Sequence, residues 1–278
     1  MTTLEQLVDG IDFGEGPRWH DGRLWYSDFY QHAVYAVTPA GVRERIVEVP
    51  QQPSGLGWLP DGRLLVVSML DQRVLRLDGA QLVEHADLSA VATGPCNDMV
   101  VSARGDAYVG NFGTRPADGP PEAALAHVAP DGRVAVAATG LRFPNGSVIT
   151  ADGGTLIVAE SAGACLTAFA LHPDGSLGAR RVWAAVEGSA PDGCTLDAAG
   201  GLWFADAGGQ RVVRVLEGGE VTDVIETGAG TYACMLGGED GRTLYIVTAP
   251  GVSAEECAGK GGGRILQTRV DAPRVGLP

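Results

Sequence analysis

Cysteine is scarce in this sequence, and its number is odd. No two cysteines have the Cys-x-x-Cys spacing of a zinc or redox site, and none stands at zinc-finger spacing from a histidine. A disulfide framework is therefore not expected, and we interpret the thiols as reduced and mostly buried. The five cysteines are Cys96, Cys165, Cys194, Cys234 and Cys257.

Long apolar runs and a basic leader are also missing. The first ten residues contain no basic segment followed by an apolar stretch, and nowhere do about 18 apolar residues follow one another. We therefore expect a cytoplasmic protein without a membrane partner. The 20 basic residues are outnumbered by 34 acidic ones, so the net charge of −14 also disfavours a nucleic acid partner.

Helical periodicity is absent too, whereas 41 glycines and 16 prolines indicate many turns. One unit recurs along the chain: a turn that contains glycine, usually Asp-Gly, followed at once by a short apolar or aromatic strand. The marker glycines of these units are Gly22, Gly62, Gly105, Gly153, Gly200 and Gly241. Their spacing of 40 to 48 residues is typical of the blades of a β-propeller.

Each marker turn predicts a hairpin, because the adjoining runs, such as LWYS and LIVA, are rich in β-branched and aromatic residues. Further strands such as HAVYAV and RVVRVLE follow each hairpin and bring the unit to about four strands. We therefore predict an all-β fold, a single six-bladed β-propeller domain that spans residues 1–278.

The last unit is one strand short. We expect the N-terminal stretch LEQLVDG, residues 4–10, to supply that strand and so to close the ring. Residues 251–263, GVSAEECAGKGGG, are predicted to form a flexible loop within the same blade.

One position of the repeat carries polar side chains in most units. It lies eight residues before the marker glycine, or seven in the first unit, where the strand that leads into the hairpin begins. Around the ring this position holds Glu15, Ser54, Asn97, Asn145, Asp192 and Ala233. Because the innermost strands of a propeller run in the same direction, equivalent positions are expected to meet at one mouth of the channel.

Four of these side chains carry a carboxylate or amide oxygen: Glu15, Asn97, Asn145 and Asp192. Oxygen donors of this kind suit one hard divalent cation, Ca²⁺ first, with Mg²⁺, Mn²⁺ or Zn²⁺ also compatible. Asn-Gly and Asp-Gly are ordinary turn pairs, so each could instead be a loop without chemistry. Four liganding residues at equivalent positions favour the metal site, since the hairpin turns are accounted for elsewhere in each unit.

At these residues the sequence resembles the regucalcin/gluconolactonase family of metal-dependent lactonases. The resemblance rests on Glu15-Gly16-Pro17, Asn97-Asp98, Asn145-Gly146 and Pro191-Asp192-Gly193, in order and at blade spacing. It implies that Glu15, Asn145 and Asp192 bind the metal, and that Asn97 is a fourth ligand or a substrate contact. It also implies that Asp192 is the general base and that Asp98 lies beside the substrate.

Three further residues are candidates for substrate contact from loops at the channel mouth. Phe112 and Arg115 follow the third hairpin, and Phe143 precedes Asn145 by two residues. Pro95 stands where sugar-lactone members of the family carry an arginine. We interpret Cys194 as a packed thiol and assign the five histidines to surface or hairpin positions.

The function that the resemblance implies is hydrolysis of a lactone, in which a cation and Asp192 activate water. No Gly-x-Ser-x-Gly motif supports a serine nucleophile. Two alternatives stay open. One is a metal-dependent propeller enzyme that acts on an epoxide, a phosphoester or a biosynthetic intermediate, and the other is a noncatalytic propeller that binds a small molecule and that a metal only staples. The expected partner is a small-molecule substrate, and the expected oligomeric state is a monomer or homodimer.

Overall fold

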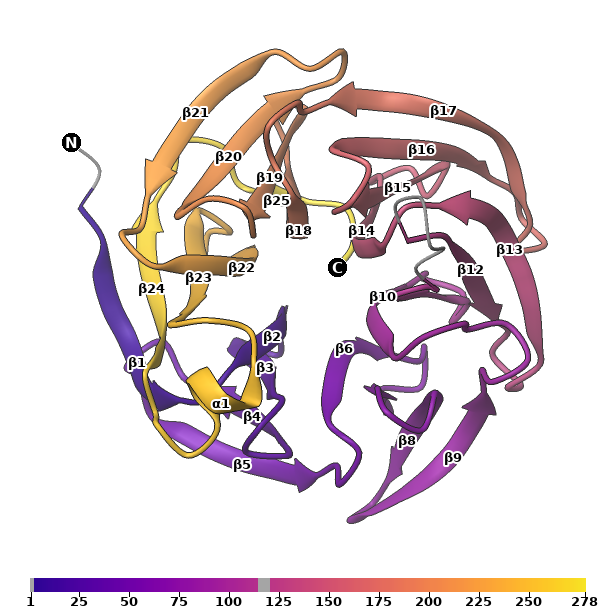
Figure 1. Cartoon of the computed structure of the whole chain (residues 1–278), viewed down its shortest axis with the longest axis horizontal. Helices are drawn as coiled ribbons and strands as arrows, with labels where there is room; N and C mark the ends of the chain where they lie inside the picture. Colours follow the sequence, from indigo (N-terminus) through magenta and orange to yellow (C-terminus); the bar gives the residue numbers. More distant parts are fainter. Residues whose placement is uncertain (1–2, 115–120) are drawn as a thin grey trace.

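The protein, described here by a computed structural model over residues 3–114 and 121–278, forms six antiparallel sheets arranged in a ring (Figure 1). The predicted six-bladed β-propeller is confirmed. Blades 1 and 2 contain β2 (Gly14–His20), β3 (Arg23–Asp28), β4 (Ala33–Val37), β5 (Arg43–Glu48), β6 (Pro53–Trp58), β7 (Leu64–Ser68), β8 (Arg73–Asp78) and β9 (Gln81–Asp87). Blades 3 and 4 contain β10 (Cys96–Val101), β11 (Ala107–Asn111), β12 (Ala123–Val128), β13 (Val134–Leu141), β14 (Pro144–Ile149), β15 (Thr155–Glu160), β16 (Cys165–Leu171) and β17 (Leu177–Ala185). Blades 5 and 6 contain β18 (Pro191–Asp197), β19 (Gly201–Asp206), β20 (Arg211–Leu216), β21 (Val221–Glu226), β22 (Gly230–Gly237), β23 (Thr243–Ala249), β24 (Gly263–Arg269), β1 (Glu5–Ile11) and β25 (Arg274–Val275).

The N-terminal strand closes the ring as predicted. Strand β1 pairs with β24 from Glu5 opposite Gln267 to Ile11 opposite Gly263, and it completes the sheet of blade 6. Strands from both ends of the chain therefore share one sheet, which leaves no blade with an unpaired strand in this position.

Residues after β24 make a contact that the repeat did not predict. Strand β25 adds a fifth strand to blade 5, with Val275 opposite Leu196, and Leu277 forms a bridge with Ile149 of blade 4. The C-terminal end therefore lies near the centre of the ring (Figure 1). Leu277 and Pro278 line the cavity at the end of the innermost strands that is remote from Glu15.

The segment 251–263 is not wholly a loop. It contains the one-turn helix α1 (Ala254–Cys257), which begins at a capping box between Ser253 and Glu256. The Ser253 side chain accepts from the Glu256 amide, and Glu256 accepts in return from the Ser253 amide. The Ser-x-x-Glu spacing was visible in the sequence, so the prediction of a flexible loop missed a local signal.

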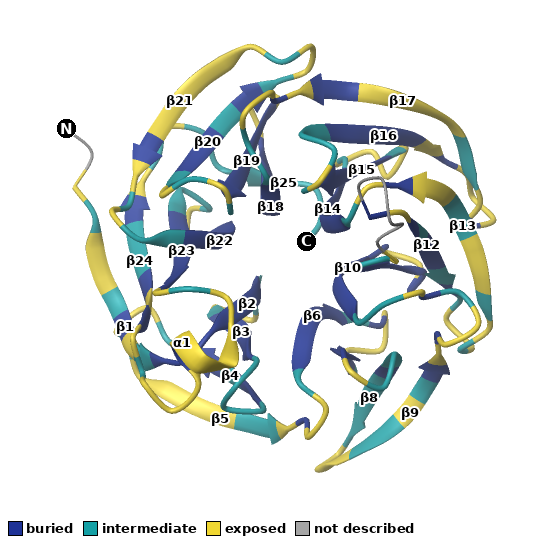
Figure 2. Ribbon diagram, in the orientation of Figure 1, coloured by how far each residue is buried: buried dark blue, intermediate teal, exposed yellow. Residues whose placement is uncertain are grey.

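The apolar core lies between neighbouring blades. Inner strands are buried on both faces, whereas the outermost strands, such as β5 and β21, are mostly exposed (Figure 2). Between blades 2 and 3, for example, Leu65 and Val67 share a cluster with Met99 and Val109. Burial of this apolar surface stabilises the ring by about 25 cal/mol per Å².

In the parts of the chain that the structure describes, no helix is both long and apolar enough to cross a membrane.

Candidate functional site

The four predicted ring residues lie on the innermost strands of four blades. Glu15, Asn97, Asn145 and Asp192 stand near the starts of β2, β10, β14 and β18, and each side chain is buried. The strand register shifts beside the predicted site residue in each of these blades, beginning at Glu15 in β2 and one residue before the site residue in the other three strands, which marks a β-bulge or similar irregularity there. Bulges aim a side chain away from the regular alternation of a strand, and all four side chains line one cavity.

Two glycines explain how the innermost strands approach so closely. A Cβ atom on Gly146 would lie 2.4 Å from the Asp192 carbonyl oxygen, and one on Gly193 would lie 2.6 Å from the Ala233 Cβ. Asn145-Gly146 and Asp192-Gly193 therefore lie inside strands as close-contact pairs, and the alternative reading of these pairs as loop turns is wrong.

A cavity of about 530 Å³ opens above the ring residues. All four contribute to its lining, together with residues from the loops that join strands at this face of the propeller. Phe143 and Phe112 also line it, whereas Asp98 does not. Arg115 lies outside the described residues.

The two ring carboxylates share a buried, mutually repulsive environment. Burial raises the pKa of Glu15 well above its usual range, and the negative charges of Asp192 and Asp98 raise it further. Burial likewise raises the pKa of Asp192, with Asp98 again adding to the effect. A nearby positive charge opposes these effects: Arg18 lowers the pKa of Glu15, and a bound cation would lower the pKa of both groups.

Asp98 is held beneath the ring by a buried arginine that sequence reasoning missed. Arg18 of β2 donates to the Asp98 Oδ1 at 2.5 Å, and both side chains are at most 4% exposed. Arg18 also donates to the backbone oxygens of Pro17, Leu56 and Met99, so it joins three blades. This placement gives Asp98 an internal partner and separates it from the cavity.

The charges in this region do not balance. When ionised, Glu15, Asp98 and Asp192 carry three negative charges, and Arg18 supplies one positive charge. The described lining of the cavity contains no lysine, arginine or histidine. Two negative charges are left uncompensated, which equals the charge of one divalent cation.

One carboxylate oxygen that could bind a metal also has no partner within the described part of the protein. The buried Asp192 Oδ1 has no hydrogen-bond partner among the described residues. No set of three or more His, Cys, Asp or Glu side chains in the described ranges is placed to hold a metal alone. An oxygen site here therefore depends on the amide oxygens of Asn97 and Asn145 as well as on the two carboxylates.

Ser161 fixes the orientation of the Asn145 amide. Its hydroxyl donates to the Pro191 carbonyl at 2.7 Å, so it can only accept from Asn145, whose Nδ2 lies 3.1 Å away. The Asn145 Oδ1 is thereby left without a protein donor in the described parts of the chain. The same hydroxyl ties blade 4 to the residue that precedes Asp192.

The comparison with protein families decides the relationship. The family model described as "SMP-30/Gluconolactonase/LRE-like region" matches residues 13–250, a stretch that contains Glu15, Asn97, Asn145 and Asp192. The chain belongs to this family.

Relatives with assigned activities cover nearly the full length. A 6-deoxy-6-sulfogluconolactonase of Pseudomonas putida is 28% identical over 95% of this chain and 94% of its own. A pentonolactonase of Haloferax volcanii is 27% identical over 99% and 97% of the two chains. The crystal structure of a calcium-binding protein, regucalcin, from Agrobacterium tumefaciens superposes with a TM-score of 0.80 at 20% identity over 99% and 97%. The last likeness establishes a common fold.

In this family member, acidic residues at the ends of the second strands anchor the segments that enter the ring. Glu160 accepts from the Arg142 amide at 2.7 Å, and Asp206 accepts from the Ala190 amide at 2.8 Å. Asp28 does the same for the amide of Phe13 at 3.2 Å. These residues end the recurring motifs LWYSD, LIVAE and LWFAD, so the repeat carried their signal, although their role was not predicted.

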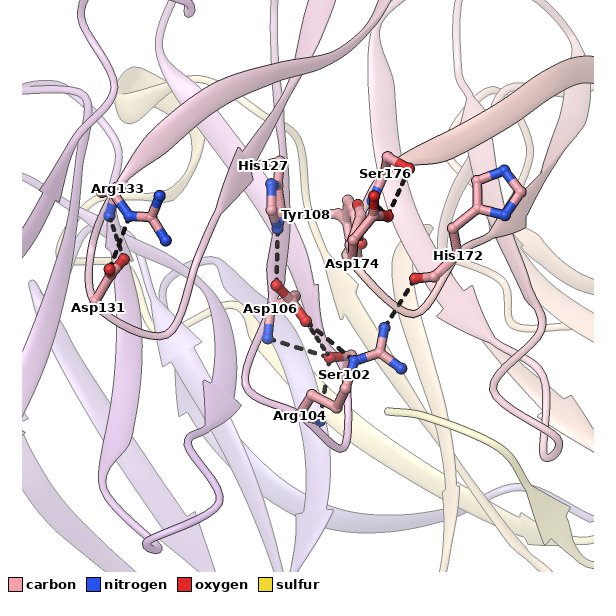
Figure 3. Close-up of polar contacts among 11 residues, drawn as sticks. Ser102, Arg104, Asp106, Tyr108, His127, Asp131, Arg133, His172, Asp174 and Ser176 are labelled. Atoms are coloured by element: carbon pink, nitrogen blue, oxygen red, sulfur yellow. Dashed lines mark hydrogen bonds and ion pairs between the residues drawn. The ribbon is translucent and has the colours of Figure 1, made fainter.

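No cysteine or histidine belongs to the described lining of the cavity. All five cysteines are free, and burial raises the pKa of the Cys194 thiol, which opposes a thiolate nucleophile. Within blade 3, His127 of β12 lies against Asp106, which directly precedes β11 (Figure 3), and the His127 Nε2 is 2.9 Å from the Asp106 Oδ1. Ser102 also binds Asp106, so the serine and histidine share one carboxylate and do not form a catalytic triad.

Proposed function

We propose that this protein is a divalent-metal-dependent hydrolase that opens a lactone, with Asp192 as the general base. Two lactonases match this chain over nearly its whole length, and they support lactone hydrolysis in general. Dependence on a metal is supported mainly by the four buried, oxygen-bearing side chains at the floor of the cavity. Its two uncompensated charges and the unpartnered Asp192 Oδ1 fit one bound cation.

The residues proposed to hold the cation are Glu15, Asn145 and Asp192, with Asn97 as the fourth. All four offer oxygen, and Ca²⁺ accepts mixed carboxylate and amide oxygens more readily than metals that prefer nitrogen or sulfur. The calcium-binding description of the structural neighbour is consistent with this choice. Mg²⁺, Mn²⁺ and Zn²⁺ are the alternatives that a reloading experiment separates.

When bound, the cation supplies Lewis acidity toward the ester carbonyl. Asp192 takes a proton from water as the water oxygen bonds to the carbonyl carbon. The bond between that carbon and the ring oxygen then breaks, and Asp192 returns the proton to the leaving oxygen, which gives a hydroxy acid. Asn97, at the cavity floor, and Phe143, on its wall, are the proposed substrate contacts.

Asp98 is assigned a different role from the predicted substrate contact. Because its carboxylate faces Arg18 and not the cavity, we propose that it sets the charge beneath the ring. Arg115, the other predicted contact, keeps the status of a sequence-based expectation.

The function is tested with metal-free protein that is reloaded with Ca²⁺, Mg²⁺, Mn²⁺ or Zn²⁺. We expect hydrolysis of simple γ- and δ-lactones only after reloading. One equivalent of metal per chain should be enough to restore the full rate. Release of acid is followed with a pH indicator. Hydrolysis at the full rate without metal would overturn metal dependence, and no hydrolysis of any lactone with any metal would overturn the lactonase.

Changing Ser161 to alanine is expected to weaken Ca²⁺ binding by roughly tenfold, because partners of metal ligands typically contribute this much to affinity. The variant frees the Asn145 amide to rotate, and the Asn145 Oδ1 is then no longer held for the cation. Isothermal titration calorimetry of the metal-free protein measures the change.

Ser27→Ala is the matched control. The Ser27 hydroxyl also donates to a carbonyl of the next blade, that of Ser54 at 2.6 Å, but no proposed ligand depends on it. Equal Ca²⁺ affinities for the two variants would show that Ser161 does not position Asn145.

A further inference from the structure

The walls of the cavity differ in character from its floor. The floor carries the four oxygen-bearing side chains, whereas most of the described wall is apolar or aromatic. The only charged groups in the described lining are Glu15 and Asp192, which both belong to the floor. A ligand that reaches the floor must therefore pack most of its surface against apolar groups.

Two aromatic groups flank the floor from opposite parts of the ring. On the side of blades 3 and 4, Phe112 and Phe143 stack with ring centroids 4.7 Å apart. On the side of blades 1 and 6, Phe13 lies 4.8 Å from Tyr232 and 4.9 Å from Phe29. The two aromatic groups lie on opposite sides of the four oxygen-bearing side chains, and we call the space between them the aromatic slot.

The backbone holds the first pair in place. The Phe112 amide donates to the Pro95 carbonyl at 3.0 Å, and the Phe143 carbonyl accepts from the Ser161 amide at 3.1 Å. Phe143 has a φ of 59°, which is rare for a bulky residue and is retained mainly where the surroundings enforce it. Both rings are only half-buried, so they present apolar surface to the cavity.

Polar groups near the wall are largely engaged within the protein. The Asn97 and Asn145 amide nitrogens donate to Pro144 and Ser161, and the Tyr30 hydroxyl donates to the Val252 carbonyl at 2.6 Å. In the described lining, the Gln52 amide and the Tyr232 hydroxyl are the side-chain donor groups that make no hydrogen bond to the protein, against the four hydroxyls of a gluconolactone. A hydroxyl that is buried without a partner lowers affinity by about tenfold or more.

We infer that the substrate is a lactone whose ring bears an aryl or other bulky apolar substituent, and not a polyhydroxylated sugar lactone. This inference rests on the proposed lactone hydrolysis. The ester group lies over the four oxygen-bearing side chains, and the substituent lies between the two aromatic groups. The volume of about 530 Å³ holds a six-membered lactone with a phenyl group.

The test compares three six-membered lactones that all release an alkoxide: δ-phenyl-δ-valerolactone, unsubstituted δ-valerolactone and D-glucono-1,5-lactone. Rates with the Ca²⁺-loaded protein are divided by the spontaneous hydrolysis rates to remove differences in reactivity. We expect kcat/KM for the phenyl lactone to exceed that for the gluconolactone at least tenfold. A preference for the gluconolactone would overturn the inference and leave the lactonase standing.

The variant Phe143→Ala locates the preference. We expect kcat/KM for the phenyl lactone to fall about tenfold more than kcat/KM for δ-valerolactone, because only the phenyl substituent packs against the Phe143 ring. Trp58→Ala is the matched control, because Trp58 lines the cavity at the remote end of the innermost strands. Equal losses on both substrates, or the same loss in Trp58→Ala, would count against the aromatic slot.

A binding measurement decides the inference independently of turnover. The lactam 6-phenylpiperidin-2-one keeps the ring and the phenyl group but resists hydrolysis. Calorimetric binding to the Ca²⁺-loaded protein, weakened about tenfold in Phe143→Ala, supports the apolar site even if no lactone is hydrolysed and the proposed function fails. Absence of lactam binding overturns the inference even if lactones are opened.

Discussion

Asp192→Asn is expected to lower kcat for lactone hydrolysis by at least about 10³-fold while the propeller still folds. Loss of a general base alone costs about 10² to 10⁴ in rate, and this variant also loses a proposed cation ligand. The metal-free variant should be no less stable than the wild type, because burial and neighbouring negative charge already oppose ionisation of Asp192. The increase in Tm that Ca²⁺ produces in the wild type should be largely lost.

Ser54→Ala is the control for this experiment. Ser54 occupies the equivalent position in blade 2, is buried and does not line the cavity, so we expect its kcat to stay within about twofold of the wild type. Retention of most activity in Asp192→Asn would remove the residue from catalysis. A different outcome would favour a metal that only staples the blades. In that case the wild type opens no lactone, and Asp192→Asn in the presence of Ca²⁺ is much less stable than the Ca²⁺-loaded wild type.

Arg18→Met is expected to destabilise the protein by about 3–5 kcal/mol, the usual cost when one partner of a buried ion pair is removed. The change leaves the Asp98 carboxylate buried without its countercharge, close to Glu15 and Asp192. It also leaves the carbonyls of Leu56 and Met99 without their donor. Urea unfolding of the metal-free protein at neutral pH measures the difference in the free energy of unfolding.

Two further variants test the cause. Asp98→Asn in the Arg18→Met background should recover part of the loss, because the uncompensated charge is then absent. Arg133→Met removes an exposed pair with Asp131, whose side chains are 83% and 58% exposed, and should change stability by less than about 1 kcal/mol. A cost for Arg18→Met as small as that of the surface control would show that the buried pair does not hold the blades together.

Repetition made much of the fold readable from the sequence. Each Asp-Gly or similar turn stands at the same place in its blade, so six such turns with five intervals near one period were enough to predict the six-bladed ring. The same argument located Glu15, Asn97, Asn145 and Asp192, since residues at equivalent repeat positions occupy equivalent places around the channel. The closing strand was predictable because the last unit was visibly one strand short.

Contacts between blades were decided only by the tertiary structure. Arg18 and Asp98 are 80 residues apart, and Ser161 reaches Pro191 of the next blade, so periodicity within one unit carries no information about either contact. The aromatic groups of the cavity wall also combine residues from different blades, such as Phe112 with Phe143 and Phe13 with Tyr232. The sequence by itself determined which four oxygen-bearing side chains line one cavity, because their equivalent places depend on the repeat. Only the folded ring decided how these side chains are oriented and buried and how their pKa values are shifted, because these properties depend on neighbours from other blades.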